Sequence, residues 1–434
     1  MKRYILDELA QWKDNPNHKP LILQGARQTG KTWIMQHFAE QYSNNYIYIN
    51  FEDNQLLEHL FERDFDMDRI SLEIEVATGK RLTERTLLLL DEIQEVKRGI
   101  TALKYFYEKR PDISVIAAGS LLGLAMHNND SFPVGKVEFM PVYPLSFCEF
   151  LEAMDENGLV RLIQECRYDF LATFANKLEG YLKQYFYIGG MPEVVAAFAQ
   201  NKDFRAARKI QMQILNSYEQ DFSKHAPAKE VPRIRMVWNS IVAQLSKENK
   251  KFIYGLIKEG ARAKDFELAL EWLRDAGLIY KVPRTKKGLL PLSAYEDFSA
   301  FKVYLSDIGL LGAMAELPVE AFLQTSTFFT DFKGALTEQF VFEQLRLDST
   351  NRIFYWSQEQ SQGEIDFLVQ RESTIIPIEV KAAENLRAKS LRLFVSSYEG
   401  LHGVRFSLSP YREQEWMTNY PLYTAETALK KKQE

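Results

Sequence analysis

The stretch LILQGARQTGKTW, residues 21–33, constrains the fold more than any other part of the chain. Apolar residues lead into Gly25 and Gly30, and Lys31 and Thr32 follow at once, so the stretch matches the pattern G-x-x-x-x-G-K-[ST]. The pattern leaves a strand-like apolar run and opens the helical pattern TWIMQHFAEQY. In such a unit the loop N–H groups and the positive end of the helix dipole favour an anion. The stretch therefore predicts a phosphate-binding loop, and the alternative is a glycine-rich turn that merely begins a helix.

This loop predicts a nucleotide site with magnesium. The residues expected around the phosphates are Gly25, Ala26, Arg27, Gln28, Thr29, Gly30, Lys31 and Thr32. Lys31 is expected to reach the β- and γ-phosphates, and the Thr32 hydroxyl is expected to bind Mg²⁺. The expected cofactors are therefore ATP and Mg²⁺.

The stretch LLLLDE, residues 87–92, supplies the second half of the predicted site. Four leucines are typical of a strand buried on both faces, and Asp91 and Glu92 follow at its carboxyl end, where α/β sheets bind ligands. Asp91 is expected in the Mg²⁺ shell, and Glu92 is expected to polarise the water that attacks the γ-phosphate. The stretch ISVIAAGS predicts a further strand that ends at Ser120, whose hydroxyl could sense the γ-phosphate. The alternative for these residues is an ordinary solvated strand end.

Size and charge limit the remaining possibilities. A chain of 434 residues exceeds what one hydrophobic core usually supports, so two to four domains are expected. The net charge of -5 gives no overall positive field that would attract nucleic acid, so any basic surface must be local. Only two cysteines occur, and no run of eighteen apolar residues is present, so we expect reduced thiols, no membrane span and a cytoplasmic protein.

The pattern of apolar and polar residues changes along the chain. Residues 1–150 alternate between short apolar runs and helical patterns, which indicates a parallel sheet covered by helices. Residues 151–225 read as helical throughout. Residues 226–315 contain several helices and end in a helix followed by a two-stranded hairpin, and residues 320–434 return to strands. The expected fold class is therefore α/β, with the parallel sheet first and a second α/β domain last.

The predicted hairpin of the third segment carries a local basic group. Lys281, Arg284, Lys286 and Lys287 lie in and around its presumed tip, where they could meet the phosphates of DNA. The alternative is that they only keep an exposed turn soluble.

The stretch GEIDFLVQRESTIIPIEVKA, residues 363–382, predicts a second charged site. Side chains two apart on a strand share a face, so Glu379 and Lys381 do so. If Glu372 and Ser373 form a two-residue turn, Asp366 lies directly across from Glu379. Two close carboxylates repel unless a cation lies between them, and their oxygens suit Mg²⁺ or Mn²⁺. The alternative is a charged, solvated sheet face with surface ion pairs.

The chain resembles AAA+-like bacterial and archaeal ATPases that carry a C-terminal domain of unknown function. The motifs that carry this resemblance are Gly25–Thr32, Leu87–Glu92, AAGSLLG, VEFMPVYPLSFCEF, YFYIGGMPEVV, KVYLSDIGLLGAM and GEIDFLV with IPIEVKA. The resemblance implies a P-loop ATPase core over residues 1–150, a helical lid over 151–225, a winged-helix-like segment over 226–315 and a restriction-endonuclease-like domain over 320–434. Many relatives carry a Gly-Arg pair before VEF; this chain has Gly135 and Lys136, and lysine lacks arginine's planar fork.

The C-terminal domain is also similar to PD-(D/E)xK nucleases. Asp366, Glu379 and Lys381 match the three signature positions, and Glu338 in KGALTEQFVFEQL matches an acid that such folds contribute from their first helix. The resemblance implies that Glu338, Asp366 and Glu379 bind metal and that Lys381 helps to generate or place the attacking hydroxide. Fold likeness alone does not confer activity.

Together these patterns predict an ATPase that hydrolyses ATP with Mg²⁺. Its nucleotide state is expected to act on the nuclease-like terminus, which in turn acts on DNA or on another partner. Two alternatives remain open: a signalling ATPase whose terminus only binds a partner, and a terminus that binds DNA or drives self-association without cutting.

Overall fold

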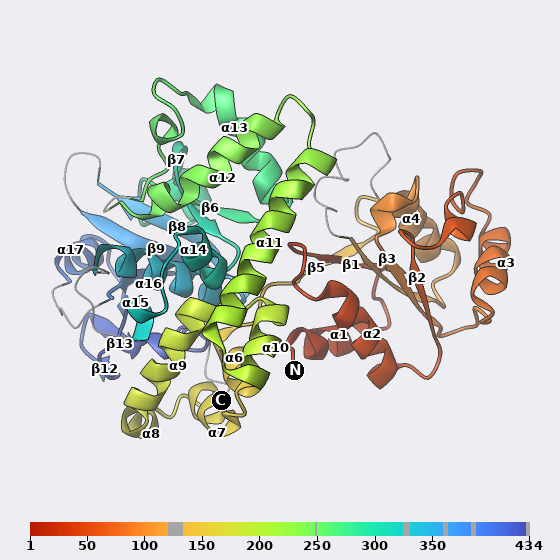
Figure 1. The fold of residues 1–434 in the computed structure, drawn as a ribbon. Coiled ribbons are helices and arrows are strands. Elements are labelled where there is room, and N and C mark those ends of the chain that lie inside the picture. Colours follow the sequence, from red (N-terminus) through yellow and green to blue (C-terminus); the bar gives the residue numbers. More distant parts are fainter. Residues whose placement is uncertain (120–132, 248–249, 324–329, 359–362, 383–387, 431–434) are drawn as a thin grey trace. The chain divides into compact units, whose positions relative to one another are not determined.

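The computed structural model describes residues 1–119, 133–247, 250–323, 330–358, 363–382 and 388–430 (Figure 1). The chain divides into two compact units. One comprises residues 2–143 with 275–278, and the other comprises residue 1, 144–274 and 279–434. Within the described ranges, none of the helices combines the length and apolarity needed to cross a bilayer.

The first unit is a parallel sheet between helices, as the sequence predicts. Its five strands have the order β2-β3-β4-β1-β5 and are all parallel. The elements are α1 (Ile5–Asp14), β1 (Leu21–Gln24), α2 (Lys31–Tyr42), β2 (Tyr46–Asn50), η1 (Gln55–Leu57), α3 (Met67–Thr78), β3 (Leu87–Asp91), η2 (Ile93–Glu95), α4 (Gly99–Lys109), β4 (Ser114–Ala118) and β5 (Glu138–Pro141). This order places β1 and β3 near the middle of the sheet, with β4 between them.

Strand β3 shows why four consecutive leucines form a central strand. Leu87 and Leu89 pack with α1 and α2 on one face, and Leu88 and Leu90 pack with α3 and α4 on the other. All four side chains are fully buried. The predicted strand buried on both faces is thereby confirmed, and it holds Asp91 at the carboxyl edge of the sheet.

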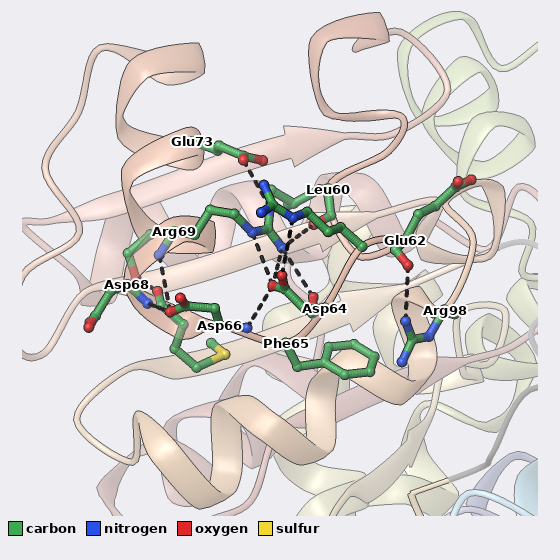
Figure 2. A network of polar contacts seen from close by, with 12 residues as sticks. Leu60, Glu62, Asp64, Phe65, Asp66, Asp68, Arg69, Glu73 and Arg98 are labelled. Atoms are coloured by element: carbon green, nitrogen blue, oxygen red, sulfur yellow. Dashed lines mark hydrogen bonds and ion pairs between the residues drawn. The ribbon is translucent and has the colours of Figure 1, made fainter.

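A polar network fixes the connection between β2 and α3 (Figure 2). The Arg69 guanidinium donates to the Asp64 carboxylate at 3.0 Å, to the Leu60 carbonyl at 3.2 Å and to the Glu73 carboxylate at 2.9 Å. The Asp66 side chain caps α3 by accepting from the N–H of the residue two positions later, at 3.0 Å. This long connection is therefore tied to the helix that covers the sheet.

The second unit combines many helices with one mixed sheet. Its helices are α6 (Phe147–Ala153), α7 (Asn157–Gln164), α8 (Tyr168–Thr173), α9 (Ala175–Ile188), α10 (Pro192–Asn201), α11 (Phe204–His225), α12 (Val231–Leu245), η3 (Tyr254–Leu256), α13 (Ala263–Asp275), η4 (Leu292–Tyr295), α14 (Ile308–Met314), α15 (Glu320–Leu323), α16 (Thr330–Leu345), α17 (Lys389–Ser397) and η6 (Leu422–Thr424). Its strands are β6 (Ile279–Thr285), β7 (Glu296–Leu305), β8 (Arg352–Ser357), β9 (Glu364–Arg371), β10 (Thr374–Val380), β11 (Gly403–Ser407), β12 (Arg412–Glu413) and β13 (Met417–Pro421).

The predicted hairpin β6–β7 belongs to this sheet and is not a free wing. The order of the eight strands is β12-β13-β11-β10-β9-β8-β6-β7, and β6 pairs in parallel with β8 through Arg284 and Tyr355. The boundary that the sequence analysis places between residues 315 and 320 lies between β7 and β8, which belong to one sheet, and it stays a prediction. The backbone groups along β6 find partners in β8, a pairing between segments about 70 residues apart that local sequence patterns do not encode.

The hairpin β9–β10 has the register that the sequence predicts. Thr374 pairs with Arg371 and Ile378 pairs with Phe367, so paired residue numbers sum to 745. Glu372, in the turn, has a φ of 51°. Continued by one step, this register places Asp366 on β9 opposite Glu379 on β10.

Three of the quoted motifs meet in the core of the second unit. The Gly190 N–H donates to Asp307 Oδ2 at 2.6 Å, and the Gly190 carbonyl accepts from the Leu145 N–H at 2.7 Å. A Cβ on Gly190 would lie 2.1 Å from the Leu145 carbonyl oxygen, and one on Gly309 would lie 2.4 Å from the Ile188 carbonyl oxygen. These glycines therefore permit a backbone approach that no side chain would allow.

Candidate active site

The loop between β1 and α2 has the backbone of an anion-binding nest. Gln28 has a φ of 65° and Gly30 a φ of 89°, and helix α2 begins at the next residue. Left-handed residues among right-handed ones make concavities of N–H groups that bind phosphate oxygens. A Cβ on Gly25 would lie 2.2 Å from the Val142 carbonyl oxygen, so the start of the loop requires glycine.

The Lys31 ammonium lies inside this loop. Its Nζ donates to the carbonyl oxygens of Gly25 and Ala26, each at 2.8 Å, and the residue is 7% exposed. Burial lowers the pKa of Lys31 to about 8, although the carboxylates of Glu92 and Asp91 oppose this effect. A phosphate oxygen carries negative charge, so the ammonium group would bind it more strongly than these neutral carbonyl oxygens. The ammonium group therefore already lies in the loop, where it could donate to a bound phosphate instead.

A buried arginine that the sequence analysis missed holds the backbone of the loop by a hydrogen bond. Arg3 donates to the Thr29 carbonyl at 3.2 Å and to the Tyr143 carbonyl at 2.7 Å. The guanidinium therefore joins the phosphate loop to the segment after β5. No local pattern marks Arg3, because it precedes an ordinary amphipathic helix.

Asp91 and Thr32, the two residues expected to bind Mg²⁺, lie next to each other. The Thr32 hydroxyl donates to Asp91 Oδ2 at 2.7 Å, and the Tyr48 hydroxyl donates to the same oxygen at 3.0 Å. Asp91 is 2% exposed, and burial raises its pKa while the two hydroxyl hydrogen bonds oppose that rise. Hydroxyl and carboxylate oxygens are the ligands that Mg²⁺ prefers, so this pair fits the ion.

Tyr48 is a second residue that the sequence analysis missed. Burial and the neighbouring Asp91 raise the pKa of Tyr48, so its hydroxyl keeps its proton and acts as a donor. Strand pairing brings it into place, because Tyr48 on β2 lies opposite Leu89, two residues before Asp91 on β3. The alternating pattern YIYIN is the only sequence signal, and it indicates a strand without indicating a partner.

Glu92 follows in a strained backbone conformation, with a φ of 50°. Its N–H donates to Asp91 Oδ1 at 3.1 Å, and its Oε2 accepts from Gln94 Nε2 at 2.5 Å. A left-handed conformation at a residue other than glycine costs about 1–3 kcal/mol and is typical of functional sites. The side chain expected to polarise water is therefore held by a neighbouring amide.

Two further predictions concern the edge of this region. Ser120 lies outside the described residues, so its proposed role stays a prediction. Lys136, at the position where many relatives carry arginine, contacts Glu108 at 3.3 Å and lies over the ring of Tyr107 at 5.3 Å.

In the second unit, lysines surround the acid predicted on the helix. Glu338 on α16 accepts from Lys302 Nζ at 3.0 Å, and Lys250 and the Tyr304 hydroxyl also donate to it. Although burial would raise the pKa of Glu338, Lys250 and Lys302 lower it to about 2. Glu338 is 3% exposed, so it is a buried ion-pair group.

The other two predicted carboxylates lie on the β9–β10 hairpin. Asp366 Oδ2 accepts from the Val380 N–H at 2.7 Å, and burial and Glu338 raise the pKa of Asp366 to about 7. Glu379 is 5% exposed and pairs with Lys381 at 2.9 Å. Over the described residues, no group of three or more acidic, histidine or cysteine side chains is arranged to hold a metal ion. The metal-binding role predicted for Glu338, Asp366 and Glu379 therefore stays a prediction, and in this structure lysines pair with the first and the last of these carboxylates.

The basic residues predicted at the hairpin tip are partly neutralised. Arg284 pairs with Asp297, and Lys281 pairs with Glu271 at 2.8 Å. The hydrogen bonds from Ser299 and the ion pair with Arg284 outweigh burial and lower the pKa of Asp297 to about 2. These two cations are thus less available to nucleic-acid phosphates than the sequence analysis assumes.

Comparisons with known proteins agree with the first part of this description. Residues 17–151 match the model of an AAA domain, and residues 179–321 and 333–425 match two domains of unknown function, DUF8612 and DUF4143. An uncharacterized protein of Methanocaldococcus jannaschii is 23% identical over 431 residues, which cover 95% of this chain and 86% of that protein. An uncharacterized protein of Haemophilus influenzae is 25% identical over 201 residues, or 44% of each chain.

Two solved structures are similar at low identity. A Walker-type ATPase of Pyrococcus abyssi has 14% identity and a TM-score of 0.44, covering 73% of this chain and 95% of that one. The Orc1 protein of Aeropyrum pernix in complex with DNA has 13% identity and a TM-score of 0.27, covering 73% and 93%.

Proposed function

We propose that the N-terminal region, which is an AAA P-loop domain, binds ATP together with Mg²⁺ and hydrolyses it to ADP and phosphate. The observation that carries the proposal is the contact between Thr32 and Asp91 at 2.7 Å, directly beside a phosphate loop that encloses the Lys31 ammonium. A loop that only began a helix would not need a buried carboxylate from another strand beside it.

Each of these residues has a distinct chemical task. The loop N–H groups and Lys31 would hold the β- and γ-phosphates, while Thr32 and Asp91 would hold Mg²⁺. When bound, the ion would neutralise charge that develops on the phosphates. Glu92 would orient the attacking water and accept its proton, which requires the contact with Gln94 to open or the second carboxylate oxygen to act.

The first expected result is nucleotide binding and turnover that both depend on Mg²⁺. The purified chain should bind a fluorescent ATP analogue and release phosphate from ATP when Mg²⁺ is present. With EDTA, turnover should fall by about 100-fold or more, because the charge stabilisation supplied by the ion is lost. If the chain has no measurable affinity for adenine or guanine nucleotides in Mg²⁺, the proposal is wrong.

A second expected result concerns Tyr48. Replacing Tyr48 with phenylalanine removes one hydrogen bond to Asp91, which is worth about 1 kcal/mol net, or about 5-fold in binding. The Mg²⁺ concentration for half-maximal turnover should therefore rise about 5-fold, while nucleotide affinity in EDTA stays unchanged. Tyr46→Phe is the matched control, because Tyr46 lies on the same face of β2 and its ring contacts the Lys80 ammonium. Equal shifts in both variants would contradict the role of Tyr48.

We further propose that nucleotide state controls the second unit, which acts on DNA or on a protein partner, self-association included. The finer prediction, a metal-dependent nuclease at Asp366, Glu379 and Lys381, is one possibility. The other is a module that binds its partner without cutting it. The lysines paired with Glu338 favour the second possibility, because the metal-binding prediction needs that carboxylate to be available.

A further inference from the structure

A fully buried lysine lies at the centre of the charged side chains of the second unit. Lys302 on β7 is 0% exposed, and its Nζ lies 3.0 Å from Glu338 Oε1 on α16 and 2.5 Å from Glu364 Oε1 on β9. It also lies over the ring of Tyr355 on β8, 5.0 Å from the ring centre. One ammonium thus joins a helix and two strands of the sheet.

Both oxygens of Glu338 are occupied. Oε1 accepts from Lys302 and from the Tyr304 hydroxyl, and Oε2 accepts from Lys250. A divalent cation at this carboxylate would have to displace an ammonium or lie beside two of them. At such separations, like charges in a buried site repel strongly. Glu338 is therefore satisfied without a metal ion.

The charges around Lys302 nearly balance. We call Glu338, Glu364, Asp366 and Glu379 the carboxylate cluster. The lysines that pair with or lie near them are Lys250, Lys302 and Lys381. Buried carboxylates need compensating cations, and here three ammonium groups and the Arg405 guanidinium near Glu379 supply them.

We infer that Lys302 serves as an internal cation for the carboxylate cluster. Its ammonium group neutralises charge that a divalent metal ion would otherwise have to neutralise when the second unit folds. This role explains why a lysine occupies a fully buried position in AFKVYL, the mostly apolar second half of β7. It also explains why Tyr304, which lies on the same face of β7 as Lys302, points its hydroxyl to the same acid.

One carboxylate oxygen of the cluster could still accept a metal ion, so an experiment must test for metal binding there. Glu379 Oε2 is buried and has no hydrogen-bond partner within the described part of the chain, whereas its Oε1 pairs with Lys381. A cation could approach this oxygen, but only one further carboxylate, Asp366, lies on the neighbouring strand at the facing position. The wild-type chain must therefore be tested directly for metal binding.

The first experiment measures Mn²⁺ binding to the full chain without nucleotide, by electron paramagnetic resonance of free Mn²⁺. The wild-type chain and a double variant, Asp366→Asn with Glu379→Gln, should bind the same number of ions at up to 1 mM Mn²⁺ (roughly the weak end of protein metal sites). Plasmid incubated with the wild-type chain and Mn²⁺, with or without ATP, should remain intact. An ion bound by the wild type and lost in the double variant would overturn the inference. So would nicking that disappears in Asp366→Ala.

The second experiment removes the internal cation. Lys302→Met keeps a long side chain but deletes the charge, so repulsion among the remaining carboxylates should lower the melting temperature in EDTA. Millimolar Mn²⁺ should then raise the melting temperature of this variant by several degrees more than that of the wild type, since both chains share the Thr32–Asp91 site. Lys281→Met on β6 is the control, since Lys281 is paired with the half-buried Glu271 and lies over the Phe301 ring, and neither belongs to the carboxylate cluster. A folded Lys302→Met chain that Mn²⁺ stabilises no more than the wild type would overturn the inference; if this variant does not fold, the wild-type titration decides alone.

Discussion

Replacing Glu92 with glutamine is expected to stop ATP turnover while leaving ATP binding intact. Glutamine keeps the size of the side chain but cannot accept a proton from the attacking water. General-base catalysis contributes about 100- to 10,000-fold, so turnover should fall within that range. The groups that hold the phosphates and Mg²⁺, namely Lys31, Thr32 and Asp91, are unchanged, so affinity for a fluorescent ATP analogue should stay within about 2-fold, a change of ~0.4 kcal/mol.

The comparison with Lys31→Ala makes this result specific. That variant removes the ammonium inside the loop, so it should lose both tight binding and turnover. Glu95→Gln is the control. Glu95 is the exposed last residue of η2, which follows Glu92, and its carboxylate also accepts from Gln94, at 3.3 Å. Phosphate release and nucleotide affinity are measured for all of these variants. Undiminished turnover in both Glu92→Gln and Lys31→Ala would remove the proposed mechanism.

The parts of this site that could be predicted from sequence are those that are contiguous in the chain. The loop from Gly25 to Thr32 carries its own geometry, because its glycines and the helix that follows are encoded within a dozen residues. The leucines before Asp91 predict a strand buried on both faces, and burial in the structure agrees. The β9–β10 register was predictable for the same reason, since a two-residue turn leaves a single way to pair the strands.

The residues that sequence analysis missed reach their partners through tertiary structure. Tyr48 contacts the site because β2 pairs with β3. Arg3 does so because β1 and β5 are neighbours in the sheet, although they are far apart in the sequence. Lys302 lies in the stretch SAFKVYLSD, where a charged residue in an apolar strand is a weak signal on its own. Its neighbour Tyr304 shares its face, and this Lys-x-Tyr spacing predicts two donors on one side of the strand. Their acceptor, Glu338, lies on α16, and this contact forms only when the helix packs against the complete sheet.

Gly190→Ala should produce the largest loss of stability in the second unit. The added Cβ would lie 2.1 Å from the Leu145 carbonyl oxygen and 2.7 Å from its nitrogen, so the backbone must separate there. The separation would also break the hydrogen bonds that Gly190 makes with Leu145 and Asp307. Overpacking costs about 1–3 kcal/mol and each buried hydrogen bond about 1 kcal/mol more, so we expect a loss of about 3–5 kcal/mol in the free energy of unfolding.

Helix α9, which ends two residues before Gly190, offers a control of opposite sign. Gly180 lies within α9, and a Cβ there would meet nothing within 4 Å. Alanine is favoured over glycine inside a helix by about 0.5–1 kcal/mol, so Gly180→Ala should stabilise the unit. Urea unfolding followed by circular dichroism measures both variants, and their midpoints should move in opposite directions. Equal, small changes would mean that the close approach of Gly190, Leu145 and Asp307 does not hold the helices and the sheet of this unit together.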